Sequence, residues 1–177
     1  MEEAELETIR AFANTLDEEE ETDALATPEG LVAWLAEAGL ADGVDRVTRA
    51  VRERTVVLRD AIRGLLEHHN GAPLDPGIVA ALDAQAARSR VVLGFAADPL
   101  ARTLVPRAQG LDGALGLIVV LVGDGIADGS LRRLKLCRAV DCRWAFLDGS
   151  RNGSRHWCSM EVCGNREKAR AFRARRR

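Results

Sequence analysis

All four cysteines of this 177-residue chain lie in its last quarter, at Cys137, Cys142, Cys158 and Cys163. They form two pairs, with four residues inside each pair and fifteen residues between the pairs. A short turn inside each pair brings two thiolates to one side, and a loop of hairpin length lets the two pairs meet as a tetrahedron. Because Zn²⁺ favours four-coordinate, all-sulfur sites, the spacing predicts one closed structural zinc site with these four ligands.

Other uses of the four thiols remain open at this point. Two disulfides or an iron–sulfur cluster would also engage four cysteines, and a redox thiol needs only one. The acidic N-terminus lacks the basic segment and apolar core of a signal peptide, so we expect a cytoplasmic location. In that reducing compartment, paired cysteines more often bind metal than each other. His156 lies two residues before Cys158 and is an alternative ligand, although a surface or supporting role fits it better.

The charge of the chain divides between an acidic body and a basic end. Residues 131–177 contain 14 Lys or Arg and 4 Asp or Glu, a balance of +10. Residues 1–130 contain 11 basic and 23 acidic side chains, a balance of −12. A basic segment attached to an acidic body is typical of a part that faces nucleic acid. We place a domain boundary in the Gly- and Asp-rich connector at 123–130, which gives a body of residues 1–128 and a zinc-binding segment of residues 129–177.

The body is predicted to be mainly α-helical, as a helical bundle. Thr27 can cap one helix, and Gly39 can end it in a left-handed turn. Apolar residues recur at helical spacing in five stretches, which are residues 5–16, 27–40, 44–68, 77–89 and 111–126.

Three other stretches of the body have their own interpretation. Short β-rich runs on either side of an Asp98-Pro99 turn indicate one small hairpin. The acidic run 17–23 is interpreted as a solvated loop. The longest apolar run, residues 114–123, is too short to cross a bilayer, so we expect a buried helix and no membrane contact.

The zinc-binding segment has a treble-clef-like order of knuckle, hairpin and helix. Residues 131–136 predict a short strand that leads into the first cysteine pair, and residues 143–148 can pair back on it. Ser159 is a suitable N-cap for a final helix, which puts Cys163 in or near the first turn. The positive end of that helix favours an ionised thiolate at Cys163.

Basic residues recur in order along the predicted final helix. Four arginines follow one another at steps of four, three and four residues and therefore share one face. An apolar stripe of Val162, Ala169 and Phe172 lies on another side and is expected to pack on the zinc knuckle. Arginine suits phosphates and guanine edges, and the alternative is a solvated, charged helix end. The residues predicted to contact nucleic acid are Arg166, Lys168, Arg170, Arg173 and Arg177.

Residues 158–175, CSMEVCGNREKARAFRAR, resemble the CGNR zinc finger, whose namesake motif here is Cys163-Gly164-Asn165-Arg166. Upstream, RAFANTLD (10–17) and ATPEGLVAWLAEAGL (26–40) are similar to the ABATE domain that usually precedes this finger. The two resemblances cover nearly the whole chain. They imply a mostly helical N-terminal fold, the four cysteines as zinc ligands, and a stress-related bacterial transcription regulator. Duplex DNA as the partner, in preference to RNA, rests mainly on this resemblance.

The sequence argues against catalysis. It contains no phosphate-binding loop, no G-x-S-x-G and no H-E-x-x-H, and an all-cysteine zinc site has no open coordination position. We therefore expect no enzyme. A DNA-binding regulator is the first hypothesis, and an RNA-associated or protein-interaction zinc module is the second, with another copy of the chain as a candidate partner. If the body senses a ligand, the candidates to line its pocket are Arg10, Asn14 and Trp34.

Overall fold

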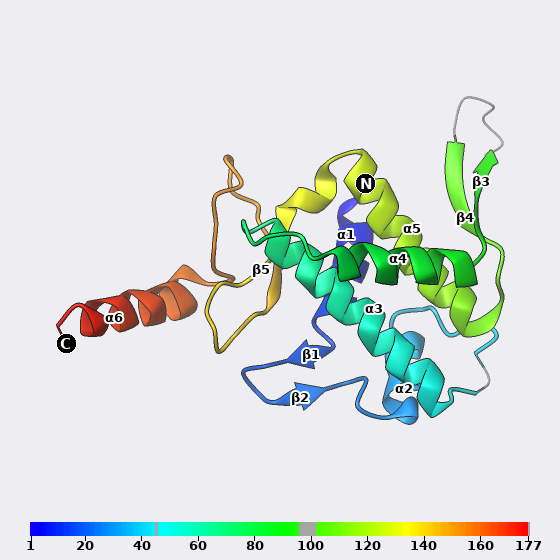
Figure 1. Cartoon of the computed structure of the whole chain (residues 1–177), viewed down its shortest axis with the longest axis horizontal. Coiled ribbons are helices and arrows are strands. Elements are labelled where there is room, and N and C mark those ends of the chain that lie inside the picture. The colour runs from blue at the N-terminus through cyan, green and yellow to red at the C-terminus, as the bar shows by residue number, and fades with distance from the viewer. Residues whose placement is uncertain (45, 96–101, 177) are drawn as a thin grey trace.

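A computed structural model describes residues 1–44, 46–95 and 102–176 (Figure 1). The helices are α1 (Glu3–Ala13), α2 (Pro28–Glu37), α3 (Arg49–His68), α4 (Pro76–Arg88), α5 (Gly110–Ala127) and α6 (Asn165–Ala174). The strands pair as antiparallel ribbons, β1 (Leu16–Asp17) with β2 (Thr22–Asp23), β3 (Val91–Phe95) with β4 (Arg102–Pro106), and β5 (Leu134–Leu136) with β6 (Ala145–Leu147). A mainly helical body followed by a small cysteine-rich finger confirms the predicted fold class.

Side-chain caps decide where the helices begin. The Thr27 hydroxyl accepts a hydrogen bond from the Gly30 N–H at 3.1 Å, and Gly39 adopts a φ of +68°, as predicted for the two ends of α2. The Thr48 hydroxyl caps α3, so that helix begins at Arg49 rather than at residue 44. The connector predicted at 123–130 is helical up to Ala127, because α5 continues through the buried Gly125.

The core of the body forms where α1, α3 and α5 meet. Ile9, Ile62 and Ile118 are fully buried, and each buried side chain of this size contributes about 1.5–3 kcal/mol. The same cluster continues into the ribbon β5–β6, where Leu134 and Ala145 are also fully buried. The hydrophobic core of the body therefore extends across the boundary predicted at 128/129.

Helix α5 is long and apolar enough to cross a membrane, with a mean hydropathy of 1.7 over 18 residues, and among the described residues it is the one such helix. It packs instead against α1, α4 and β4. Its inner side, which includes Leu115, Ile118 and Val122, is buried in the core. These contacts confirm the prediction of a buried helix.

The ribbon β3–β4 confirms the predicted hairpin. Its register runs from Val91 opposite Pro106 to Phe95 opposite Arg102. The predicted turn at Asp98-Pro99 lies outside the described residues.

The prediction of a solvated loop at 17–23 holds in part, because residues 19–22 are exposed whereas both ends of the segment contact the body. The short strands β1 and β2 lie at its ends, and Asp17 Oδ1 accepts the N–H of Glu19 and of Glu20 at 3.0 and 3.1 Å. Glu18 pairs with Arg63, which is only 4% exposed, because a buried guanidinium needs a nearby carboxylate. Ion pairs with arginines of α3 thus hold the two ends of this acidic segment against the body.

Two glycines of α5 test how tightly this helix packs. A Cβ atom at residue 116 would lie 2.6 Å from Ser89 Cβ, whereas one at residue 123 would meet only Leu104 Cδ1, at 3.5 Å. We expect Gly116→Ala to lower the free energy of unfolding by about 1–3 kcal/mol through overpacking. Gly123→Ala should leave it unchanged or raise it by up to about 1 kcal/mol, because alanine favours helix. Urea denaturation followed by far-UV circular dichroism measures both, and equal effects would contradict the packing.

Candidate metal centre and nucleic-acid interface

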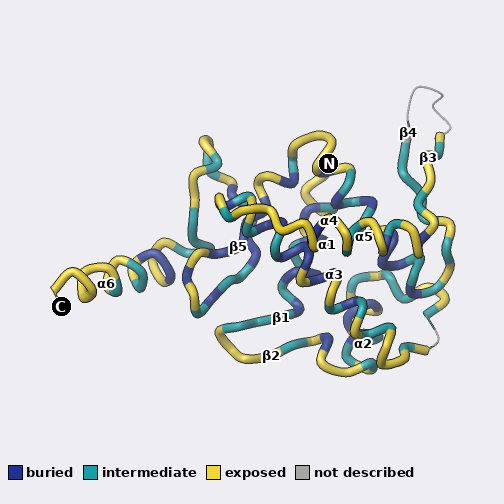
Figure 2. The backbone as a smooth tube through the Cα atoms, viewed as in Figure 1, coloured by how far each residue is buried: buried dark blue, intermediate teal, exposed yellow. Residues whose placement is uncertain are grey.

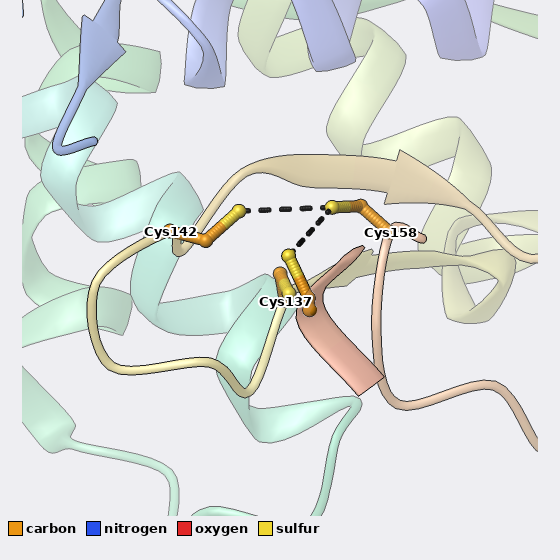
Figure 3. A group of neighbouring side chains, drawn as sticks. Cys137, Cys142 and Cys158 are labelled. Atoms are coloured by element: carbon orange, nitrogen blue, oxygen red, sulfur yellow. Dashed lines mark hydrogen bonds between the residues drawn. The ribbon is translucent and has the colours of Figure 1, made fainter. Parts of the chain in front are cut away.

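The four cysteines predicted as zinc ligands meet between the ribbon β5–β6 and the start of α6. Cys137 directly follows β5, Cys142 lies shortly before β6, and Cys163 lies in the π-helical turn η2 (Met160–Gly164) that leads into α6. All four sulfur atoms lie within 4.8 Å of one another. Figure 3 shows the side chains of Cys137, Cys142 and Cys158 pointing toward a common centre.

The sulfur positions fit one tetrahedral zinc ion. Cys142 Sγ lies 3.6 Å from Cys158 Sγ, which lies 3.7 Å from Cys163 Sγ. A regular tetrahedron with Zn–S bonds of about 2.3 Å has edges of about 3.8 Å. A disulfide requires about 2.05 Å, and all four thiols are free. The four cysteines thus provide one structural zinc site, and the disulfide alternative does not hold.

Burial makes the thiols poor acids until a metal binds. Desolvation raises the pKa of Cys142 far above the usual thiol range and raises the pKa of Cys158 to about 12. The backbone N–H of Trp144 donates to Cys142 and by itself would lower the pKa of this thiol, but desolvation outweighs it. Zinc binding therefore displaces protons from the site, as expected for a metal that binds thiolates.

An unusual backbone conformation shapes the first knuckle. The N–H groups of Cys142 and Arg143 both donate to the Ala139 carbonyl, at 3.1 and 3.2 Å. Arg143 has a φ of +49°, which costs a residue with a side chain roughly 1–2 kcal/mol. Its guanidinium offsets this cost by donating to both carboxylate oxygens of Glu67 in α3 at 3.0 Å, and to Glu18 at 3.1 Å. Arg143 thus ties the knuckle to the body.

A buried ion pair organises the long loop between the cysteine pairs. Lys135 Nζ donates to Asp148 Oδ2 at 2.8 Å, and Asp148 accepts the backbone N–H groups of Ser150 and Arg155. Burial alone would raise the pKa of Asp148, but these donors outweigh it and lower the pKa. The pair therefore stabilises the fold at neutral pH, and its contribution is lost as the pH falls toward the lowered pKa.

The second knuckle depends on close packing before α6. Ser159 Oγ accepts the Val162 N–H at 3.2 Å, which confirms the predicted N-cap. The Gly164 N–H donates to the Ser159 carbonyl at 3.0 Å, and a Cβ atom on Gly164 would lie 2.5 Å from Met160 Sδ. This geometry turns the chain sharply, so that Cys163 is buried among the other thiols.

Two arginines predicted to contact nucleic acid are held in ion pairs. Arg166 Nη1 donates to Asp141 Oδ2 at 2.6 Å, and its Nη2 donates to Glu19 Oε1 at 2.7 Å. Arg170 Nη2 donates to Asp141 Oδ2 at 2.7 Å, and its Nη1 donates to Glu167 at 2.5 Å. The hydrogen bonds from Arg170 and Arg166 lower the pKa of Asp141 well below its usual range. One face of α6 is thereby fastened to the first knuckle.

The remaining basic residues of α6 face solvent. Lys168 and Arg173 are exposed, and the ion pairs described for this helix involve neither of them. Arg177 lies outside the described residues. The sequence analysis missed Arg175 and Arg176, which are also exposed. Lys168 and Arg175 are seven residues apart, and this spacing predicts that they share one face of the helix.

The apolar stripe of α6 does not pack on the knuckle, so that prediction is wrong. Val162 is 54% exposed, Phe172 is 53% exposed, and no residue of α6 is buried. Figure 1 shows this helix projecting from the body, and Figure 2 colours most of it as exposed or intermediate. The reason is that Arg166 and Arg170 hold the helix by its charged side.

The three residues suggested to line a ligand pocket are not brought together. Arg10 donates to Glu7 at the surface, at 2.7 and 2.5 Å. Asn14 exchanges two hydrogen bonds with the backbone of Ala145, at 3.0 and 2.7 Å, and so docks β6 on α1. Trp34 packs on Phe12 in the core, with ring centroids 5.1 Å apart. Asn14 and Trp34 have structural contacts that account for their inward positions, whereas Arg10 is paired at the surface, so the three side chains do not face one common site.

Removing one thiol should release zinc without unfolding the body. We expect Cys142→Ser to reduce the zinc content from one ion per chain to nearly none after dialysis against a weak chelator, as measured by atomic emission. Far-UV circular dichroism should keep most of its helical signal, because β5–β6 stays packed in the body core.

The neighbouring variant Asp141→Asn is the matched control. Asp141 contacts Arg166 and Arg170 rather than the cysteine cluster, so this variant should retain its zinc. Zinc loss from both variants, or from neither, would contradict the assignment of the ligands.

The comparison with known families agrees with this geometry. The CGNR zinc finger profile matches residues 133–176, and the ABATE profile, described as "Putative stress-induced transcription regulator", matches residues 8–128. No curated protein matches the sequence. The ABATE match covers more than half of the chain, and the zinc finger match covers the four clustered cysteines. The chain therefore belongs to the ABATE family and ends in a CGNR zinc finger.

Proposed function

We propose that this protein is a zinc-dependent transcription regulator that binds duplex DNA through α6. The observation that carries the proposal is the exposure of this helix, which projects from the body without a buried residue (Figure 1). The major groove of DNA admits an α-helix, and duplex DNA carries one phosphate charge per ~1.7 Å of its axis. The exposed cations on this helix and directly after it are Lys168, Arg173, Arg175 and Arg176.

Zinc acts in this proposal as a structural element. The small cluster around the site consists of three buried cysteines with Ala139 and Phe146, against which Trp144, Trp157 and Cys158 pack. A core of this size is too small to hold a fold alone. Because α6 begins directly after Gly164, the metal fixes the direction in which the helix leaves the finger. Four thiolates leave no open coordination position, so we do not propose catalysis.

The charge distribution supports DNA approaching from the finger side. The finger segment 131–177 has a balance of +10, and a zinc tetrathiolate, formally −2, would leave about +8. The remainder of the chain, with a balance of −12, repels a phosphate backbone. We place the protein in the cytoplasm, where reducing conditions keep zinc-binding thiols free.

A second candidate function is contact with another protein. The exposed Val162 in η2 and Phe172 in α6 favour it, since exposed apolar side chains suit a partner surface. In that case the zinc-loaded protein would have no affinity for nucleic acid.

Selection from a random duplex-DNA pool with the zinc-loaded full chain separates these functions. The proposal expects an enriched sequence motif that persists in the presence of competitor RNA. If competitor RNA abolishes the enrichment of the DNA motif, the finger would be an RNA-associated module. Absence of any enrichment while zinc is retained would favour a protein partner and contradict DNA binding.

Neutralising the open face of α6 should weaken DNA binding. Lys168→Gln combined with Arg175→Gln removes two phosphate contacts, so the slope of log affinity against log salt should become less steep by about 1.8. Fluorescence anisotropy over a series of salt concentrations measures this slope.

The matched control removes the same charge from the body. Arg49→Gln combined with Arg88→Gln alters exposed residues at the far ends of α3 and α4. This variant should bind like the wild type, and an equal loss in both variants would show that only the net charge matters.

A further inference from the structure

Two glutamates of the body contact arginines of the zinc finger. Glu19 Oε1 accepts a hydrogen bond from Arg166 Nη2 at 2.7 Å, and Glu18 Oε1 accepts one from Arg143 Nε at 3.1 Å. These partners are 147 and 125 positions apart in the sequence. The acidic turn between β1 and β2 thus lies against the basic segment that the proposed function assigns to DNA.

Buried arginines hold this turn in place. Arg63 is 4% exposed and pairs with Glu18, while Arg59 is 2% exposed and donates to Asp23 Oδ1 at 2.7 Å. Within the turn, Asp17 accepts the Glu19 N–H. Both ends of the acidic segment therefore contact α3, and the turn between them places Glu19 beside Arg166 of α6.

The Glu19 carboxylate accepts from Arg166 Nη2, a hydrogen-bond donor that a DNA phosphate could use instead. The guanidinium of Arg166 donates a hydrogen bond from Nη1 to Asp141 and another from Nη2 to Glu19. Carboxylates and phosphates accept from arginine in the same bidentate manner. The Glu19 side chain is 42% exposed, and exposed ion pairs of this kind are weak enough for another anion to displace.

We propose that Glu19 competes with DNA phosphates for Arg166 and so lowers the affinity of the α6 surface for DNA. This inference rests on the proposed function, because it describes the regulation of the same surface. Phosphate contacts carry no base information, so the internal carboxylate lowers the affinity for every duplex sequence by the same factor. The body thereby limits non-specific binding by its own finger.

A matched pair of variants in one turn tests the competition. Glu19→Gln and Glu20→Gln each remove one negative charge, but among the residues that the structure describes, only the Glu19 side chain of these two contacts an arginine. Affinity for a random-sequence duplex is measured by anisotropy in a salt series with zinc-loaded protein. We expect Glu19→Gln to bind about 1.5- to 5-fold more tightly than Glu20→Gln, with a salt slope steeper by about 0.9. Equal affinities and slopes of the two variants would overturn the inference.

A double-mutant cycle tests whether the effect passes through Arg166. In an Arg166→Gln background, Glu19→Gln should give no gain in affinity, because the contested donor is gone. An undiminished gain in that background would overturn the inference, while DNA binding itself would stand. If neither the wild type nor any variant binds DNA although zinc is retained, the proposed function fails and this inference fails with it.

Discussion

Convergence of four thiolates on one centre is the constraint on which the finger depends. Cys137 and Cys142 come from the loop that joins β5 to β6, and Cys163 comes from the turn before α6. The metal therefore joins a ribbon that belongs to the body core with a helix that has no buried residue of its own. Without this bond, only surface ion pairs would fix the direction of α6, and such pairs are individually weak.

Arginine–carboxylate pairs form the second level of organisation, and they cross between the finger and the body. Arg143 adopts a strained backbone conformation and uses its side chain to reach Glu67 on α3. Arg166, the last residue of the motif that names the finger, reaches Asp141 of the first knuckle and Glu19 of the body. Several arginines of the finger therefore hold the structure together through intramolecular ion pairs, which limits how many remain to bind a partner.

The helical face that remains open differs from the face that the sequence pattern suggested. A regular spacing of arginines identifies a stripe but does not say whether the stripe faces solvent. Asp141 lies 29 positions from Arg170 along the chain, so their contact depends on the tertiary fold that brings the two knuckles together. Exposure of Lys168 and Arg175 on the other side follows from that contact.

The sequence by itself determined the features that depend on local chemistry. The spacing of the cysteines predicted the metal centre, hydrophobic periodicity predicted the helices, and capping residues such as Thr27 and Ser159 predicted helix starts. Tertiary structure alone decided the roles of the charged residues. The acidic segment 17–23 folds onto buried arginines, and Asn14 pairs with the backbone of a strand 131 positions away. Ion pairs and polar contacts of this kind join residues that are distant in sequence, so no local pattern encodes them, whereas thiol spacing and apolar periodicity act within a few turns of the chain.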